Sequence, residues 1–204
     1  MTLLQKFRAV VWAAIVVLIV GLAVRYAVRD TIPPDQVPAM RPVSGIGGPF
    51  AMVDQQGRPF TEADLKGRAT AMFFGYTYCP DVCPTTLLEA SQWMAQLGAD
   101  AERFRVVFVT VDPERDTPAK LAEYLGSFDP RFVGLSGDRA ATDKILAAYR
   151  VFARKVEGKD GDYTMDHTAA TYLLDAEGRF VGVINFQEPT DKALAKIRNL
   201  ITRR

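Results

Sequence analysis

ATAMFFGYTYCPDVCP, at residues 69–84, joins a continuous apolar run to two cysteines. The run 69–76 has the length of a strand and is apolar almost throughout, as expected for a central strand that is covered on both faces. The segment that follows predicts a helix over 84–97, because its apolar residues recur at helical spacing. Cys79 and Cys83 therefore lie where a buried strand gives way to a helix.

The rest of the chain after about Phe50 continues this alternation of strand and helix patterns. The further elements that we expect are a hairpin at 50–60, a strand at 104–111, a helix from Thr117-Pro118 to about Leu125, a strand at 132–135, a helix at 138–149, a hairpin at 168–175 and 179–185, and a helix at 190–202. We expect a Gly- and charge-rich loop before the second hairpin. This order predicts an α/β protein with a mixed central sheet, for which the thioredoxin-like fold is the natural candidate.

A long apolar run lies near the amino terminus, from Ala9 to Val24, between basic residues. As a helix the run spans about 24 Å, short of a hydrocarbon core of about 30 Å, so we extend the expected transmembrane segment to about 9–28. A cleaved signal peptide is the alternative, because a basic start and small residues near Ala23 also fit that pattern. Both interpretations place the rest of the chain outside the cytoplasm.

The expected organisation has three parts: a membrane anchor at 1–29, a Pro- and Gly-rich linker at 30–49, and a folded thioredoxin-like domain at 50–204. Too few residues precede the apolar run for a mitochondrial transit peptide. We therefore expect a single-pass protein of the bacterial inner membrane with its C-terminal domain in the periplasm. Basic residues flank the run on both sides, so this orientation depends more on function than on the distribution of charge.

Composition excludes several classes of protein. Lys and Arg number 25 against 24 Asp and Glu, so the basic excess expected of a nucleic-acid binder is missing. A hydrophobic content of 49% excludes a disordered chain. The chain has two Cys and one His, too few for a disulfide framework or a four-cysteine zinc site. Any thiol or soft-metal chemistry must therefore use Cys79, Cys83 and His167.

The two cysteines are suited to thiolate chemistry. A proline follows each of them, which favours a place in or beside the loop, next to the positive end of the helix dipole. That environment lowers the pKa of a thiol. Cys79 and Cys83 could form a structural disulfide, a redox-cycling dithiol or part of a soft-metal site, and three soft ligands would suit copper(I).

Several residues near these cysteines have more than one interpretation. His167 would be an ordinary loop residue by position alone, but in a thioredoxin-like fold its segment approaches the cysteine loop. Asp166 could orient the imidazole, and Met165 is a potential thioether ligand that more often serves in packing. Asp112 and Asp116 lie in a loop that should reach the same edge of the sheet, where they could cap a helix or act near a metal. Their roles stay open.

The chain resembles the SCO/SenC proteins, which are membrane-anchored thioredoxin-like factors in cytochrome c oxidase assembly. The resemblance extends from about residue 44 to the end of the chain. The segments that carry it are FGYTYCPDVCP at 74–84, VDPERDTP at 111–118, VGLSGD at 133–138, AYRVF at 148–152 and DHTAATYLLDAEGRF at 166–180. It implies one copper ion per chain, Cu(I) or Cu(II), with Cys79, Cys83 and His167 as its ligands.

The resemblance implies a metallochaperone that delivers copper to the binuclear copper centre of oxidase subunit II. The alternative is a thiol-disulfide oxidoreductase that keeps the client cysteines reduced, with Cys79 and Cys83 as its redox dithiol. A weaker third hypothesis is a redox or copper sensor. The upstream copper donor is not identified by these residues, and whether the protein is an enzyme depends on which hypothesis holds.

Overall fold

The computed structural model describes residues 3–29, 40–158 and 161–202. The chain divides into two compact units, Met1–Pro38 and Ala39–Arg204. Helix α1 (Leu3–Arg29) belongs to the first unit. Its apolar segment Gln5–Val24 has a mean hydropathy of 2.6, and none of it is buried. Among the described residues, α1 is the one helix that is long and apolar enough to cross a membrane. The first half of the expected linker, 30–39, lies outside the described residues.

The second unit contains nine strands and four α-helices within the described residues. They are β1 (Ala51–Asp54), β2 (Pro59–Thr61), β3 (Ala69–Gly75), α2 (Val82–Leu97), β4 (Phe104–Thr110), α3 (Pro118–Leu125), β5 (Val133–Ser136), α4 (Arg139–Ala148), β6 (Ala153–Glu157), β7 (Tyr163–His167), β8 (Thr171–Leu174), β9 (Phe180–Ile184) and α5 (Thr190–Thr202), with 3-10 turns at Glu62–Leu65 and Gly98–Arg103. The expected helix α3 begins as predicted: the Thr117 side chain accepts a hydrogen bond from the backbone N–H of Lys120, and Pro118 is the first helical residue.

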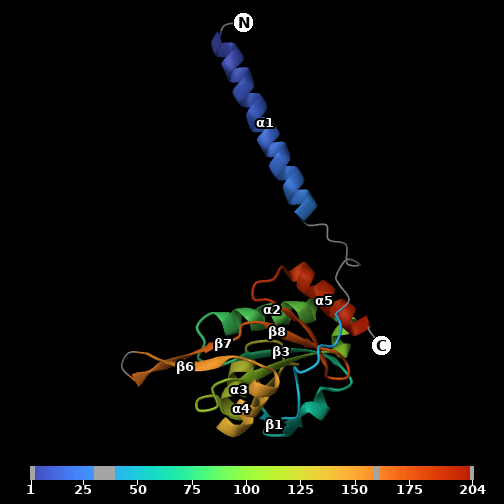
Figure 1. Ribbon diagram of the computed structural model, residues 1–204, viewed down its shortest axis with the longest axis vertical. Coiled ribbons are helices and arrows are strands. Elements are labelled where there is room, and N and C mark those ends of the chain that lie inside the picture. Colours follow the sequence, from blue (N-terminus) through green and yellow to red (C-terminus); the bar gives the residue numbers. More distant parts are fainter. Residues whose placement is uncertain (1–2, 30–39, 159–160, 203–204) are drawn as a thin grey trace. The chain divides into compact units, whose positions relative to one another are not determined.

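The larger sheet has seven strands in the order β2-β1-β5-β4-β3-β8-β9. Strands β3, β4 and β5 are parallel, whereas β8 and β9 continue the sheet in antiparallel fashion. Helices α2 and α5 cover one face, and α3 and α4 cover the other (Figure 1). This arrangement confirms the predicted thioredoxin-like α/β fold with a mixed sheet.

The centre of the sheet places three connecting segments together. Every residue of β3 is buried, which explains its continuous apolar sequence. Because β3 and β4 are parallel and Gly75 pairs with Thr110, the loops that follow them leave the sheet at the same edge. Strand β8 is antiparallel to β3 and begins at Thr171, opposite Phe73. The segment that enters β8 therefore reaches that edge as well.

The region predicted as a Gly- and charge-rich loop contains a hairpin instead. Strands β6 and β7 pair with each other in a separate two-stranded sheet, and the hairpin extends away from the main body (Figure 1). In β7 the side chains of Tyr163, Met165 and His167 are buried or half-buried, and the two residues between them are exposed. This alternation is typical of a strand with one buried face. His167 is the last residue of β7 and lies on that face.

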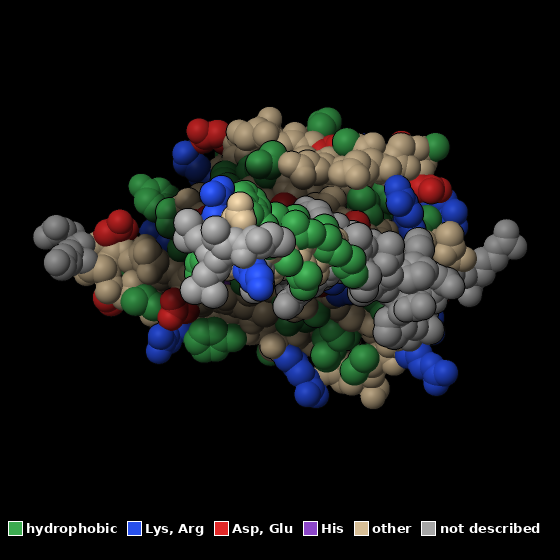
Figure 2. Space-filling model, turned by 90° about the horizontal axis from the view of Figure 1, so that it is seen from above, with side chains coloured by type: hydrophobic (Ala, Val, Ile, Leu, Met, Phe, Trp, Pro, Cys, Tyr) green, Lys and Arg blue, Asp and Glu red, His purple; other side chains and the backbone are tan. Residues whose placement is uncertain are grey.

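The charged side chains show no large patch of one sign on the face seen in Figure 2, where Lys and Arg lie interspersed with Asp and Glu around the rim. This pattern agrees with the nearly balanced composition of 25 basic and 24 acidic residues.

Candidate metal centre

The two cysteines lie at the junction of β3 and α2. Helix α2 begins at Val82, two residues earlier than predicted, so Cys83 lies in the first helical turn. Pro84 is tolerated there because the N–H groups of a first turn have no partner within the helix. The Cys83 side chain is 0% exposed, whereas Cys79 in the preceding loop is half-buried. Both thiols are free.

Gly75, the last residue of β3, makes room for the buried thiol. A Cβ at this position would lie 2.7 Å from Cys83 Sγ and 2.8 Å from Phe108 Cε2. Both distances are shorter than real Cβ contacts, and neither neighbour has free space, because Cys83 and Phe108 are completely buried. The absence of a side chain at Gly75 therefore allows the first turn of α2 to approach the sheet this closely.

Gly75→Ala is expected to displace Cys83 and to destabilise the folded unit by about 1–3 kcal/mol, because overpacking a filled core forces its neighbours to shift. Urea unfolding of the metal-free unit Ala39–Arg204 measures this change. Gly48→Ala is the matched control, because a Cβ there meets Ala148 at an ordinary 3.6 Å. Equal stability of the two variants would contradict the close packing described for Gly75.

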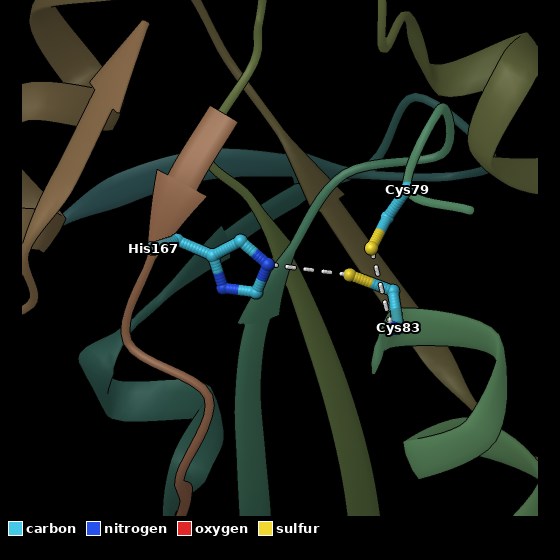
Figure 3. Close-up of side chains that lie close together, drawn as sticks. All are labelled: Cys79, Cys83 and His167. Carbon is cyan, nitrogen blue, oxygen red and sulfur yellow. Dashed lines mark hydrogen bonds between the residues drawn. The ribbon is translucent and has the colours of Figure 1, made fainter. Parts of the chain in front are cut away.

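His167 reaches the cysteines from the end of β7 (Figure 3). Its Nε2 atom lies 3.5 Å from Cys83 Sγ, and the backbone N–H of Cys83 donates a hydrogen bond of 3.4 Å to Cys79 Sγ. The ligand atoms of Cys79, Cys83 and His167 all lie within 4.8 Å of one another. This cluster could hold a metal ion, and its two sulfurs and one imidazole nitrogen are ligands that soft metals prefer.

The imidazole is oriented by its surroundings. Nδ1 lies 3.1 Å from the carbonyl oxygen of Thr168, which can only accept, so Nδ1 carries the hydrogen and donates it. That leaves Nε2 with a free lone pair directed at the thiols. The rings of Phe73 and Tyr76 contact the imidazole edge-on, at centroid distances of 6.0 and 5.8 Å. A backbone carbonyl behind a ligating histidine is the usual way of fixing its tautomer.

The two thiols differ in their electrostatics. A hydrogen bond from the Cys83 thiol lowers the pKa of Cys79 to about 3, and hydrogen bonds from the backbone N–H groups of Asp81 and Cys83 act in the same direction. The same hydrogen bond, together with burial, raises the pKa of Cys83. Cys79 is therefore the accessible thiolate, and Cys83 retains its proton in the metal-free protein.

Asp116 positions the cysteine loop without pointing a free oxygen at it. Its carboxylate accepts hydrogen bonds from the Thr77 backbone N–H (3.1 Å), the Thr77 hydroxyl (2.6 Å) and the Thr110 hydroxyl (2.6 Å). The side chain is completely buried, and burial raises its pKa. Of the roles left open by the sequence, the structure supports a structural one: Asp116 attaches the start of the cysteine loop to the end of β4.

Asp112 and Asp166 also have partners of their own. Asp112 accepts hydrogen bonds from Arg115 Nε (2.5 Å) and from the Tyr163 hydroxyl (2.9 Å). Asp166 lies on the exposed face of β7, opposite to His167, and pairs with Arg154 at 2.8 Å. The suggestion that Asp166 orients the imidazole is wrong, because neighbouring residues of a strand face opposite sides.

Met165 packs in the core, as its type suggested, and lies on the same side of β7 as His167. Arg115 and Tyr163 are the residues near the site whose contacts the sequence did not reveal. The alternation of apolar and polar residues over 163–167 was the one signal that could have placed Tyr163 on the same face as the histidine.

The fold and the site together define a class of protein. It is a thioredoxin-like domain with a dithiol at a strand-to-helix turn and a histidine delivered by a later strand. The family model for SCO1/SenC matches residues 38–202. The chain belongs to the SCO1/SenC family, which confirms the resemblance inferred from its sequence motifs.

Two similar proteins agree with the assignment to this family. The chain is 41% identical over 138 residues to a SCO2-like protein of Rickettsia felis, which covers 67% of each protein. It is 37% identical over 160 residues to the mitochondrial protein SCO2 of Saccharomyces cerevisiae, covering 76% of this chain and 53% of that protein.

Solved structures show the same fold. Bradyrhizobium japonicum ScoI with copper bound is 52% identical, with a TM-score of 0.72, and the match covers 76% of this chain and 99% of that one. Yeast Sco1 with copper bound is 34% identical, with a TM-score of 0.73 and coverage of 78% and 90%. BsSco, a member of the Sco family of cytochrome c oxidase assembly proteins, is 22% identical with a TM-score of 0.65 and covers 80% and 97%; at that identity it shows the fold alone.

Proposed function

We propose that this chain is a membrane-anchored copper metallochaperone that delivers copper to the binuclear centre of cytochrome c oxidase subunit II. The observation that carries the proposal is the convergence of the chain's two cysteines and its one histidine within 4.8 Å. The copper-bound structures of ScoI and Sco1 support copper as the metal. Cys79, Cys83 and His167 would hold one ion.

The half-buried position of Cys79 suits transfer to a client. A ligand exchange needs one donor atom that an incoming thiolate can replace, and Cys79 is more accessible than the buried Cys83. Cys83 and His167 would keep hold of the ion while the client approaches from the side of Cys79. For localisation we propose the bacterial inner membrane, with α1 as a single-pass anchor and the C-terminal unit in the periplasm.

A second candidate function is thiol-disulfide exchange with the client. An accessible thiolate of low pKa, four residues before a buried thiol that retains its proton, is an attacking and resolving pair. Cys79 would attack the client disulfide and form a mixed disulfide, and Cys83 would then displace the client as a free dithiol. The products are a reduced client and a Cys79–Cys83 disulfide, so electrons balance.

A purified copper domain of subunit II distinguishes the two functions. Copper-loaded protein is mixed with the reduced, metal-free client, and the absorption of the binuclear centre is followed with a chelator present that removes free copper. In a second arm, reduced metal-free protein is mixed with the disulfide form of the client, and client thiols are counted. We expect the centre to form in the first arm; failure there with full reduction in the second would establish the oxidoreductase instead.

A further inference from the structure

The loop at 111–117, between β4 and α3, contacts both halves of the metal centre. On the cysteine side, buried Asp116 holds Thr77 through two hydrogen bonds. On the histidine side, Asp112 and Arg115 hold Tyr163, which lies four residues before His167 on the same face of β7. One short loop thus connects two segments that are far apart in the sequence.

Arg115 makes the densest set of these contacts. Its Nε donates to Asp112 at 2.5 Å, and its Nη1 donates to the Tyr163 carbonyl oxygen at 3.0 Å. Its Cζ atom lies 3.6 Å from the ring centroid of Tyr163 and 4.9 Å from that of Tyr78, the residue next to Cys79. The guanidinium group is therefore in contact with aromatic rings from both halves of the site.

The remaining guanidinium nitrogen supports this interpretation. Nη2 of Arg115 is buried and has no hydrogen-bond partner, in contrast to almost all other buried side-chain polar atoms of the described residues. The ring of Tyr76, 5.7 Å from Cζ, completes an aromatic enclosure with those of Tyr78 and Tyr163. Attraction between a cation and aromatic faces compensates for the missing hydrogen bond. The three rings therefore stabilise the guanidinium group in this position.

The position of His167 depends on how the hairpin is held. Within the described residues, β7 pairs with β6 and with no strand of the main sheet, so its inner face is attached to the body through the contacts of a few residues. Beyond the ligand itself these are Tyr163, clamped by Asp112 and Arg115, and Met165, which is buried and whose backbone hydrogen-bonds to Tyr76. Tyr163 is the only one of the two that is held by charged groups.

We propose that Arg115 is a positioning residue that sets the approach of His167 to the dithiol by clamping Tyr163 against the loop at 111–117. The inference rests on the proposed function, because it assumes that His167 is a copper ligand. Arg115 itself does not touch the metal ligands. It also contacts the Tyr78 ring beside Cys79, but its hydrogen bonds go to Asp112 and to Tyr163 on the histidine side, so the proposed effect on copper is one that passes through His167.

Arg115→Lys tests the clamp, because lysine keeps the charge beside Asp112 but loses the planar contacts with Tyr163 and Tyr78. We expect copper(II) affinity to fall about 10-fold or more, as for other residues that orient a metal ligand, and the thiolate-to-copper absorption to move toward that of His167→Ala. In the metal-free protein, amide exchange should accelerate in β7. Tyr163→Phe, which loses only the hydrogen bond to Asp112, should change the same quantities less.

Arg154→Gln is the matched control, because Arg154 pairs with Asp166 on the outer face of the same hairpin. It should leave copper affinity and the absorption spectrum unchanged. The deciding measurement combines Arg115→Lys with His167→Ala: when the histidine is absent, the arginine substitution should have no further effect on affinity.

Two results would overturn the inference. One is a folded Arg115→Lys protein with unchanged copper affinity and spectrum, and the other is an effect that persists in the His167→Ala background. If Arg115→Lys does not fold, Tyr163→Phe decides by the same readouts. Equal copper binding by wild type and His167→Ala would instead refute the three-ligand site, so the two failures are distinguishable.

Discussion

Replacing His167 with alanine in the unit Ala39–Arg204 is expected to weaken copper(I) binding by at least about 100-fold, or about 2.7 kcal/mol. The physical reason is the loss of one of three donors. Nε2 lies 3.5 Å from Cys83 Sγ with its lone pair free, because Nδ1 donates to Thr168. No other histidine exists in the chain to take its place. Anaerobic titration of the reduced protein against a chromophoric copper(I) chelator measures the loss.

The dithiol should survive this substitution. Cys79 and Cys83 remain, so the variant should still form and lose its disulfide reversibly in a glutathione redox buffer. Cys79→Ser and Cys83→Ser, in contrast, should abolish both copper binding and redox cycling, because the chain has no spare thiol. If His167→Ala binds copper(I) with the affinity and spectrum of the wild type, the three-donor site is wrong and a two-thiolate site must replace it.

The core of the fold was predictable because its local signals agree with its tertiary structure. The apolar run 69–76 is a buried central strand, Thr117 and Pro118 begin α3, and the final helix has the bounds 190–202 that its pattern predicted. Each of these elements packs through a face that its own sequence defines. Helix α2 began two residues early because a proline in a first turn costs no hydrogen bond.

The β6–β7 hairpin was not predictable in the same way. Glycines and charged residues dominate the segment, and these normally indicate a loop. Its strands are short, one face is exposed, and its attachment depends on Arg115 and Tyr163, which are 48 residues apart in the sequence. Contacts over such separations have no signature in a local pattern.

The residues of the candidate site were likewise predictable only in part. Scarcity and motif sufficed to select Cys79, Cys83 and His167, and the antiparallel pairing of β8 with β3 explains why the histidine reaches the cysteines. The supporting carboxylates were not assignable, because Asp112, Asp116 and Asp166 look alike in sequence. Only the structure shows that two are buried in hydrogen-bond networks and the third faces solvent.

The pH dependence of Cys79 alkylation gives the second large expected effect. With a pKa of about 3, Cys79 is thiolate throughout the neutral and weakly acidic range. At pH 5 it should hold roughly 3,000 times the thiolate fraction of an ordinary cysteine with a pKa near 8.5. Thiolates form as pH rises through the pKa, so the alkylation rate should be flat from about pH 4.5 to 8, whereas an ordinary thiol gains about tenfold per pH unit.

The measurement uses reduced, metal-free protein, iodoacetamide and mass spectrometry to assign the labelled residue. Because a thiolate of low pKa is intrinsically a weaker nucleophile, the shape of the pH profile carries the information and the absolute rate does not. The profile should belong to Cys79, since Cys83 is completely buried.

Two substitutions at Cys83 isolate the cause of the low pKa. Cys83→Ala removes the thiol that donates to Cys79, so the pKa of Cys79 should rise and the rate should begin to depend on pH within the measured range. Cys83→Ser keeps a donor at the same position and should shift the profile less. A wild-type profile that rises toward pH 8 or 9, or equal profiles for the two variants, would show that the hydrogen bond from Cys83 does not hold Cys79 as a thiolate. The accessible thiolate that both proposed functions use would then need another source of stabilisation, such as the backbone N–H groups of Asp81 and Cys83 at the positive end of α2.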